Sequence, residues 1–427
     1  MKYFGTDGIR NHHQQIFKMA YPLGVVLASR HKTVAVARDT RPSSFDIEKQ
    51  LVRGLLEGGA EVHITGILPT PALAYTMKLK DIPCGVMITA SHNPPECNGL
   101  KVVGANGKLG EEEEVELDCA LDCWQSCLKN GNGKVKLNSG ASREYKRHVI
   151  SMFQHLNLGV LDRQIYLDTA HGCFSYIAKD IFETLGADVV AVCNDHEGDK
   201  INVGCGATSI GNLVEQMTDR GIGFAFDGDG DRVIAVVDGK IYDGDQILYN
   251  IASYYKSKSR GNGNVVGTIM TGSGVEKALE KQKIKLHRAD VGDKYVAKVM
   301  GETGAILGGE KSGHIIIGDK ADTGDGVITA LTFLEGYIGG FLKKAREYRT
   351  ENYNLDAQNP RATYESEDFQ VKMRKFVEKI GKRGRVIVRP SGTESVVRIS
   401  VEVYDKRLDC TKLLQELEFC KNLQKSK

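Results

Sequence analysis

A repeated strand–turn–helix–strand pattern constrains the fold of this chain more than any other feature. The first copy has an apolar strand at Thr33–Ala37, a helical stretch that stops at Gly58-Gly59, and a second strand at Val62–Ile64. Similar copies begin at Gln164 and at Asn264. This order is that of the βαβ unit. Domains usually have about 100–200 residues, so three copies in 427 residues predict three related α/β domains.

The last part of the chain follows a different pattern. A polar linker is expected at Glu351–Pro360, followed by a helix at Phe369–Ile380, strands at Gly384–Val388 and Val396–Val403, and a helix at Leu408–Leu423. The predicted fold is therefore α/β, with three related mixed-sheet domains plus a smaller C-terminal α+β domain around a central cleft. The expected domains are residues 1–145, 146–242, 243–350 and 351–427.

The charge of the chain is nearly balanced, with 57 Lys and Arg against 55 Asp and Glu. This removes the main electrostatic argument for a nucleic-acid or membrane-surface partner. The N-terminus has no apolar signal region, and no apolar run approaches the ~18 residues of a membrane helix. We therefore expect a cytoplasmic protein, a monomer or homodimer, whose partner is a small molecule rather than nucleic acid or membrane.

Two further local patterns concern the stretch from Glu111 to Cys127. The run Glu111–Glu114 is expected to start a helix as a solvated face. Cys119, Cys123 and Cys127 recur every fourth residue, which is typical of a semi-buried helix face. A metal or redox role is the alternative, although no second Cys/His pair follows.

The segment Phe226–Arg232 carries the strongest chemical signal. Its carboxylates, Asp227, Asp229 and Asp231, alternate with glycine between two apolar strands. Three such charges repel one another unless a cation lies among them, and the motif offers little else to neutralise them. A hairpin turn is the alternative, but a turn needs only one aspartate. A calcium EF-hand is excluded, because Arg232 stands where its loop needs glycine. We predict a divalent metal site, with magnesium favoured.

A candidate nucleophile follows the strand Gly85–Ile88. Ser91 lies in the segment Thr89–Pro94, and strand ends commonly carry nucleophiles. The segment is not an esterase elbow, because threonine and asparagine occupy the glycine positions. His92 is either a catalytic helper or a satisfied core group. Lys101 offers a cation near the serine.

The loop Gly308–His314 combines glycines with a carboxylate, a hydroxyl and an imidazole. Its order is not that of a Walker A motif. Glu310, Ser312 and His314 would suit the hydroxyls of a sugar, and a simple turn is the alternative.

The segment Arg389–Glu394 lies between the two expected tail strands. An arginine, two hydroxyls and a glycine-freed backbone favour an anion nest, here for phosphate. A hairpin turn is the alternative. Metal, serine, polyol and phosphate motifs, in one chain, indicate phosphoryl chemistry on a phosphorylated sugar.

Together with the opening Phe4–Arg10, these motifs resemble the α-D-phosphohexomutase superfamily over essentially the whole chain. Cys205–Thr208 and Val291–Val296 are most similar to its phosphoglucosamine mutase branch. The resemblance implies that glucosamine 6-phosphate and glucosamine 1-phosphate are interconverted through a hexose 1,6-bisphosphate, which feeds amino-sugar nucleotide and cell-wall precursor synthesis. A phosphomannomutase/phosphoglucomutase is the alternative within the superfamily. A non-catalytic sugar-phosphate binder and a magnesium phosphatase are the alternatives outside it.

The resemblance also implies roles for individual residues. Ser91 would be the phosphoserine, and its phosphate would join Asp227, Asp229 and Asp231 around one Mg²⁺ ion. Arg10, Lys101 and Arg232 would lie near the reacting phosphate, with Lys101 or His92 moving the proton. The sugar hydroxyls would be bound by Glu310, Ser312 and His314. The other phosphate would be held by Arg389, Ser391, Gly392 and Thr393.

The chain departs from the usual family pattern at four positions. Asn11 replaces glycine ahead of a shortened segment, His171 replaces asparagine, and Ser395 replaces proline. Lys311 replaces an uncharged residue in the sugar loop and bears most on the preferred hexose.

Overall fold

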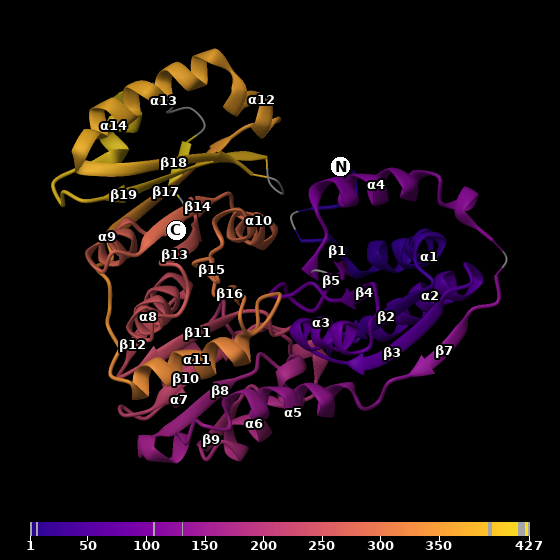
Figure 1. Cartoon of the computed structure of the whole chain (residues 1–427). Coiled ribbons are helices and arrows are strands. Elements are labelled where there is room, and N and C mark those ends of the chain that lie inside the picture. The colour runs from indigo at the N-terminus through magenta and orange to yellow at the C-terminus, as the bar shows by residue number, and fades with distance from the viewer. Residues whose placement is uncertain are drawn as a thin grey trace. The chain divides into compact units, whose positions relative to one another are not determined.

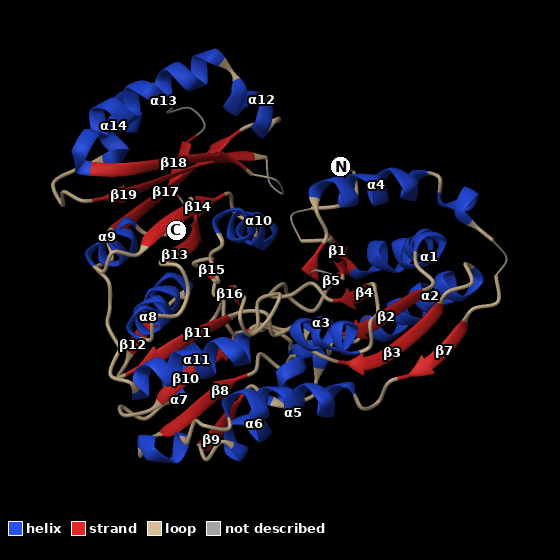
Figure 2. Cartoon of the chain, in the orientation of Figure 1, coloured by secondary structure: helices blue, strands red, loops and turns tan. Residues whose placement is uncertain are grey.

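The computed structural model describes residues 2–5, 7–105, 107–129, 131–391, 395–416 and 423–425. The chain forms two compact units, each of which combines β-sheet with helices (Figures 1 and 2). The first unit comprises Met1–Thr268 and Gln282–Lys344, and the second comprises Ile269–Lys281 and Ala345–Lys427.

Three mixed sheets form the framework of the first unit. Their strands are β1 (Ile9–His12), β2 (Thr33–Arg38), β3 (Glu61–Ile67), β4 (Cys84–Ile88), β5 (Cys97–Gly104), β6 (Gly107–Lys108), β7 (Lys134–Leu137), β8 (Gln164–Asp168), β9 (Asp188–Val192), β10 (Ile222–Phe226), β11 (Val233–Val237), β12 (Lys240–Tyr242), β13 (Asn264–Thr268), β14 (Lys285–Ala289), β15 (Leu307–Gly309) and β16 (Ile315–Ile317). The sheet orders are β1-β5-β4-β2-β3-β7, with β6 beside β5, then β12-β11-β10-β8-β9, and β14-β13-β15-β16. Parallel pairs such as β2–β3, β8–β9 and β13–β14 confirm the three repeated units.

Helices connect and cover these strands. In the first unit they are α1 (His13–Arg30), α2 (Ser44–Glu57), α3 (Thr70–Leu79), α4 (Glu111–Asp122), α5 (Ala141–Phe153), α6 (Ala178–Thr184), α7 (Gly211–Gln216), α8 (Gly244–Ser257), α10 (Asp293–Thr303) and α11 (Gly326–Ile338). Short 3₁₀ turns are η1 (Trp124–Cys127), η2 (Leu158–Leu161), η3 (Cys173–Tyr176) and η4 (Gly198–Lys200).

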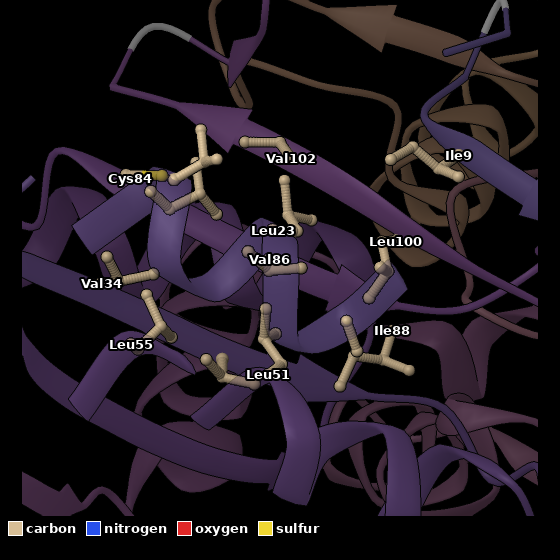
Figure 3. Packing of buried hydrophobic residues seen from close by; sticks show 14 of the residues in the cluster. Ile9, Leu23, Val34, Leu51, Leu55, Cys84, Val86, Ile88, Leu100 and Val102 are labelled. Carbon is tan, nitrogen blue, oxygen red and sulfur yellow. The ribbon is translucent and has the colours of Figure 1, made fainter. Parts of the chain in front are cut away.

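The core of the first sheet shows how strand alternation positions the helices. Cys84, Val86 and Ile88 of β4 face a cluster that includes side chains from α1 and α2 (Figure 3). Gly85 points the other way, where an added Cβ would lie 2.4 Å from Met77 Sδ of α3. Successive strand residues point to opposite faces, so α1 and α2 cover one face of the sheet and α3 covers the other.

The second unit is a smaller α+β fold. Its sheet has the order β18-β19-β17-β20, and its helices include α9 from the middle of the chain. The elements are α9 (Ser273–Lys281), β17 (Arg349–Asp356), α12 (Pro360–Glu365), α13 (Glu367–Ile380), η5 (Gly381–Arg383), β18 (Gly384–Pro390), β19 (Val396–Val403), α14 (Cys410–Glu416) and β20 (Leu423–Lys425). The fold class predicted from the sequence is confirmed, whereas the four domain boundaries stay a prediction.

Several local predictions are wrong. The expected linker Glu351–Pro360 is largely strand β17, because Glu351 and Tyr353 turn inward and the strand pairs with β19. The expected last helix ends its described part at Glu416, and Leu423 lies in a strand.

The expected cysteine face and glutamate run also differ from the structure. Cys119 and Cys123 are exposed, and Cys127 follows the end of α4, so the three do not form one semi-buried helix face. Glu114 is buried beside Lys294, 2.5 Å away, whereas the three glutamates before it are solvated as expected. Among the described helices, none is long and apolar enough to cross a membrane.

Candidate active site

Ser91 lies in the loop after β4, and its side chain is buried. Its backbone has a φ of 54°, in the left-handed region, and its N–H donates to Thr89 Oγ1 over 2.8 Å. The Ser91 Oγ donates to Asp227 Oδ2 over 2.7 Å and lies 3.3 Å from His92 Nδ1. The candidate nucleophile and the acidic loop, which lie far apart in the sequence, therefore meet in the structure.

A buried arginine that the sequence reasoning missed holds this loop. Arg41 forms an ion pair with Asp39, 2.9 Å away, and its guanidinium donates to four backbone carbonyls. Those carbonyls belong to Ser91, Asn93, Pro94 and Cys97. Asn202 also donates to the Ser91 carbonyl over 2.8 Å. The position of Arg41, just after the polar end of a strand, was the one available signal.

The three carboxylates of the acidic loop converge between β10 and β11. Asp227, Asp229 and Asp231 are buried and offer oxygens that lie within 4.8 Å of one another. An added Cβ on Gly228 would lie 2.8 Å from the Ser91 carbonyl oxygen, so the close approach of the two loops requires glycine there. Burial and the charges of its two neighbours raise the pKa of Asp227 well above the usual range.

The acidic loop fits a divalent cation. Among the described residues, Asp229 Oδ1 and Asp231 Oδ1 are buried without a hydrogen-bond partner. Carboxylate oxygens are the ligands that Mg²⁺ prefers. The expectation that little else neutralises the three charges is wrong, however. Lys101 Nζ of β5 is buried 2.7 Å from Asp231 Oδ2 and 3.2 Å from Asp229 Oδ2.

The other predicted basic residues gather around this point. Arg10 of β1 pairs with Gly99, two residues from Lys101, and forms an ion pair with Asp7. The Arg232 Nε lies 3.9 Å from carboxylate oxygens of Asp227 and Asp231. Basic groups thus line the acidic loop.

The surroundings of Lys101 and His92 determine the protonation state of each of these candidates for proton transfer. Burial disfavours the Lys101 ammonium, but Asp229 and Asp231 outweigh it and raise the pKa of Lys101. Burial, with the positive charges of Arg232 and Arg10, lowers the pKa of His92 to about 4. In this arrangement Lys101 is protonated and His92 is neutral at pH 7.

The predicted sugar loop connects β15 and β16. The His314 Nε2 lies 3.2 Å from Asp293 and 3.8 Å from Asp231, so the structure brings His314 to the acidic loop. Glu310 is half-buried, and burial raises its pKa. Ser312 and Lys311 are exposed, and Lys311 Nζ lies 3.8 Å from Asp243.

A second charged group, also missed by the sequence reasoning, adjoins His314. Lys108 forms ion pairs with Asp7 and Asp293, and burial lowers its pKa to about 8. A cavity of about 1090 Å³ opens beside it. Lys294, Tyr295 and Thr323 line this cavity together with four glutamates of α4, Glu111, Glu112, Glu113 and Glu116. Asp293 lies in the segment that carried the resemblance, whereas Lys108 had no sequence signal.

The predicted phosphate nest belongs to the second unit. Arg389 lies near the end of β18, opposite Arg398 of β19, and the Ser391 N–H donates to the Val396 carbonyl over 2.9 Å. Gly392 and Thr393 lie outside the described residues. The nest therefore stays a prediction.

Comparison with known proteins agrees with this site. Sequence models of phosphoglucomutase/phosphomannomutase match in three places: α/β/α domain I at residues 1–119, α/β/α domain III at 243–351, and the C-terminal domain at 353–409. The phosphoglucosamine mutase of Thermotoga petrophila is 40% identical over 432 residues, covering 98% of both chains.

Solved structures share the fold. A phosphoglucomutase/phosphomannomutase family protein of Burkholderia thailandensis superposes with a TM-score of 0.79 at 21% identity, covering 98% of both chains. An N-acetylphosphoglucosamine mutase of Aspergillus fumigatus, solved with GlcNAc-6P and magnesium, has a TM-score of 0.66 at 17% identity, covering 97% of this chain and 94% of its own. The chain belongs to the phosphoglucosamine mutase branch of the α-D-phosphohexomutase superfamily.

Proposed function

We propose that this protein interconverts glucosamine 6-phosphate and glucosamine 1-phosphate through a phosphoserine at Ser91. The observation that carries this proposal is the buried Ser91 hydroxyl, 2.7 Å from Asp227 and next to two further carboxylates. The preference for an amino sugar rests on full-length relatives at 38–40% identity. A phosphorylated sugar substrate also fits the cytoplasmic location expected from the sequence.

The reaction consists of two phosphoryl transfers. The phosphate on Ser91 passes to a free hydroxyl of the sugar phosphate, which gives a hexose 1,6-bisphosphate and free Ser91. The bisphosphate then reverses its orientation in the site, and Ser91 accepts the other phosphate. Phosphoryl transfer depends mainly on positioning and on charge neutralisation. Asp227, Asp229, Asp231 and the Ser91 phosphate would hold one Mg²⁺ ion, which supplies positive charge to the transferring group.

The chain's own residues supply the rest of the charge balance. Arg10, Lys101 and Arg232 surround the acidic loop and would neutralise the phosphate oxygens. The attacking sugar hydroxyl must lose a proton. Of the two predicted carriers, neutral His92 would accept it, because Lys101 is already protonated in this arrangement. Glu310, Ser312 and His314 would bind sugar hydroxyls, and the Asp293 carboxylate lies 3.2 Å from the His314 Nε2.

We further propose that the C-terminal domain holds the phosphate that is not reacting. Arg389 and Ser391, with Gly392 and Thr393, would form this site, because a guanidinium binds phosphate through parallel hydrogen bonds. A separate domain can release and re-form these contacts while the bisphosphate turns. The division into residues 1–145, 146–242, 243–350 and 351–427 assigns one of the four motifs to each domain.

The test combines phosphopeptide mapping with product analysis. The active protein should carry one phosphate, on Ser91, and Ser91→Ala should lose nearly all mutase activity while its melting temperature is retained. Ser126→Ala, on the exposed turn η1, is the matched control. Glucosamine, glucose and mannose phosphates should be assayed side by side. Full activity of Ser91→Ala, release of inorganic phosphate alone, or binding without turnover would each contradict the proposal.

A further inference from the structure

A second cluster of metal-ligating side chains lies outside the active site. His171, Cys193 and Cys205 each offer one ligand atom, and these atoms lie within 4.8 Å of one another. His171 follows β8, Cys193 directly follows the neighbouring parallel strand β9, and Cys205 lies in the loop before α7. Three separate segments thus converge at one edge of the second sheet.

The cluster is sheltered but reachable. Cys205 is fully buried, His171 is 8% exposed, and Cys193 is half-exposed. All three groups are therefore shielded, while the Cys193 side leaves an approach from solvent. Asn212 Nδ2 lies 3.1 Å from Cys193 Sγ, where its N–H can stabilise a thiolate.

The backbone around the cluster is strained. Ala170, His171 and Cys193 have φ values of 55°, 51° and 46°, in the left-handed region that side-chain-bearing residues seldom adopt. Such strain concentrates at functional sites. His171 is also one of the positions at which this chain departs from the usual superfamily pattern.

We propose that His171, Cys193 and Cys205 bind one Zn²⁺ ion. Two thiolates and one imidazole are the donor types that zinc prefers, and Mg²⁺ avoids them. Tetrahedral zinc, with bonds of about 2.0–2.3 Å, holds its ligand atoms somewhat closer together than 4.8 Å. A small closure of the three side chains completes the site, and water fills the fourth position.

The His171 ring has a partner for its second nitrogen. The Asp195 N–H donates to His171 Nδ1 over 3.2 Å, and the Asp195 carboxylate lies 3.8 Å from the same atom. Zinc binding at Nε2 would place the ring proton on Nδ1, so the hydrogen bond from the Asp195 N–H would be exchanged for one from Nδ1–H to the Asp195 carboxylate. Zinc-bound histidines usually have such a carboxylate or carbonyl partner.

The site lies directly behind the candidate nucleophile. The Ala170 carbonyl accepts from the Asn202 N–H over 3.0 Å, and the Asn202 side chain donates to the Ser91 carbonyl over 2.8 Å. The His171 carbonyl accepts from Thr40 Oγ1 over 2.7 Å. An ion at His171 would therefore stiffen the support of the Ser91 loop without touching substrate.

Cobalt(II) is the probe for this site, because thiolate ligands give Co²⁺ an intense charge-transfer absorption that oxygen ligands do not. The reduced full-length protein, in excess Mg²⁺, should bind one Co²⁺ per chain with this absorption, and Zn²⁺ should displace it. Losing an outer-shell partner costs about 10- to 100-fold in metal affinity. Loss of the thiolate in Cys193→Ser should therefore cost at least about 100-fold.

Matched variants separate this site from the active site. His171→Asn restores the residue usual in the superfamily and should weaken Co²⁺ binding at least about tenfold. This variant tests the site independently of Cys205→Ser, in which a fully buried side chain is changed. Cys127→Ser, a half-buried cysteine elsewhere, and Asp229→Asn, in the acidic loop, should keep the absorption. Absence of the band from the reduced protein, or its survival in Cys193→Ser, would overturn the proposal. So would a Cys193–Cys205 disulfide in zinc-free protein as isolated.

Discussion

Asp229→Asn should remove the stabilisation that Mg²⁺ gives to this protein, while it shifts the stability of the metal-free protein by no more than about 2 kcal/mol in either direction. Asp229 Oδ2 accepts hydrogen bonds from Thr70 Oγ1 over 2.7 Å and from Lys101 Nζ over 3.2 Å. An asparagine carbonyl can keep both bonds. The substitution therefore removes one negative charge and replaces Oδ1, which accepts no hydrogen bond within the described residues, by an NH₂ group.

The opposing charge effects at Asp229 nearly cancel. At an effective dielectric constant of about 20, the Lys101 ammonium 3.2 Å away attracts the Asp229 carboxylate by about 5 kcal/mol. A charged carboxylate within 4.8 Å repels it by at least about 3.5 kcal/mol. With one or both neighbours charged, the net change on substitution is about 2 kcal/mol in either direction.

The Mg²⁺-dependent stabilisation is a separate quantity, measured as the difference in stability with and without the ion. At 100 times its Kd, a ligand stabilises the folded state by about 2.7 kcal/mol. At about 2.1 cal/mol/K per residue, the unfolding entropy of 427 residues is about 0.9 kcal/mol/K, so this raises the melting temperature of the wild type by roughly 3 °C. The Asp229→Asn variant should lose most of this rise and nearly all mutase activity.

Thermal unfolding with and without Mg²⁺ measures both quantities. The matched control is Asp238→Asn, since Asp238 is an exposed aspartate that pairs with Arg163 after β11. The control should keep the full Mg²⁺-dependent rise. An Asp229→Asn variant that is stabilised by Mg²⁺ as strongly as the wild type would refute the assignment of the acidic loop as the metal site.

Three further predictions concern other parts of the chain. Arg41→Met should destabilise the protein by about 3–5 kcal/mol, because it leaves buried Asp39 unpaired; thermal unfolding equal to that of the wild type would contradict this. Arg389→Ala should lower kcat/KM roughly 30- to 1000-fold and release more bisphosphate, with Ser91 phosphorylation intact. Arg361→Ala, on exposed α12, is the control. Unchanged kinetics of Arg389→Ala would exclude a role of Arg389 in binding the phosphate that is not reacting. Burial raises the pKa of Asp325 from 3.8 to about 6, so between these two pH values the folded state binds this proton more strongly than the unfolded state does. The contribution of the protonated carboxyl to stability is therefore complete below about pH 4 and is lost as the pH rises through 6. Asp325→Asn should therefore reduce the slope of the free energy of urea unfolding against pH, between pH 4 and 6, by up to about 1.4 kcal/mol per pH unit. Equal slopes for the variant and the wild type would contradict this prediction.

Local patterns in the sequence predicted the framework and the reactive loops. The second copy of the repeat begins with a strand at Gln164 as predicted, and apolar strands lie on both sides of the acidic loop. Ser91 follows a strand as predicted, and the three aspartates alternate with glycine in a loop between strands. These features depend on residues within about ten positions of one another, where periodicity and glycine determine the backbone.

The linker prediction for Glu351–Pro360 was wrong, although strand β17 begins with the alternation of exposed and buried residues that is typical of a strand. Glu351 and Tyr353 alternate with the exposed Thr350 and Asn352 in β17. The polar composition of this strand is not typical of a buried strand, because a glutamate such as Glu351 is buried only where partners compensate its charge. Its carboxylate accepts from the Tyr353 hydroxyl over 2.5 Å and lies 2.8 Å from Arg349.

Tertiary structure alone decided which charged and ligating groups meet. Lys101 lies between Asp229 and Asp231, more than a hundred positions away along the chain, and neutralises charge that the motif itself left unbalanced. Arg41 reaches four carbonyls of the Ser91 loop, and His171 meets two cysteines from other segments. No local pattern encodes such contacts, because burial and charge act through distances in space, and those distances exist only after the sheets have assembled.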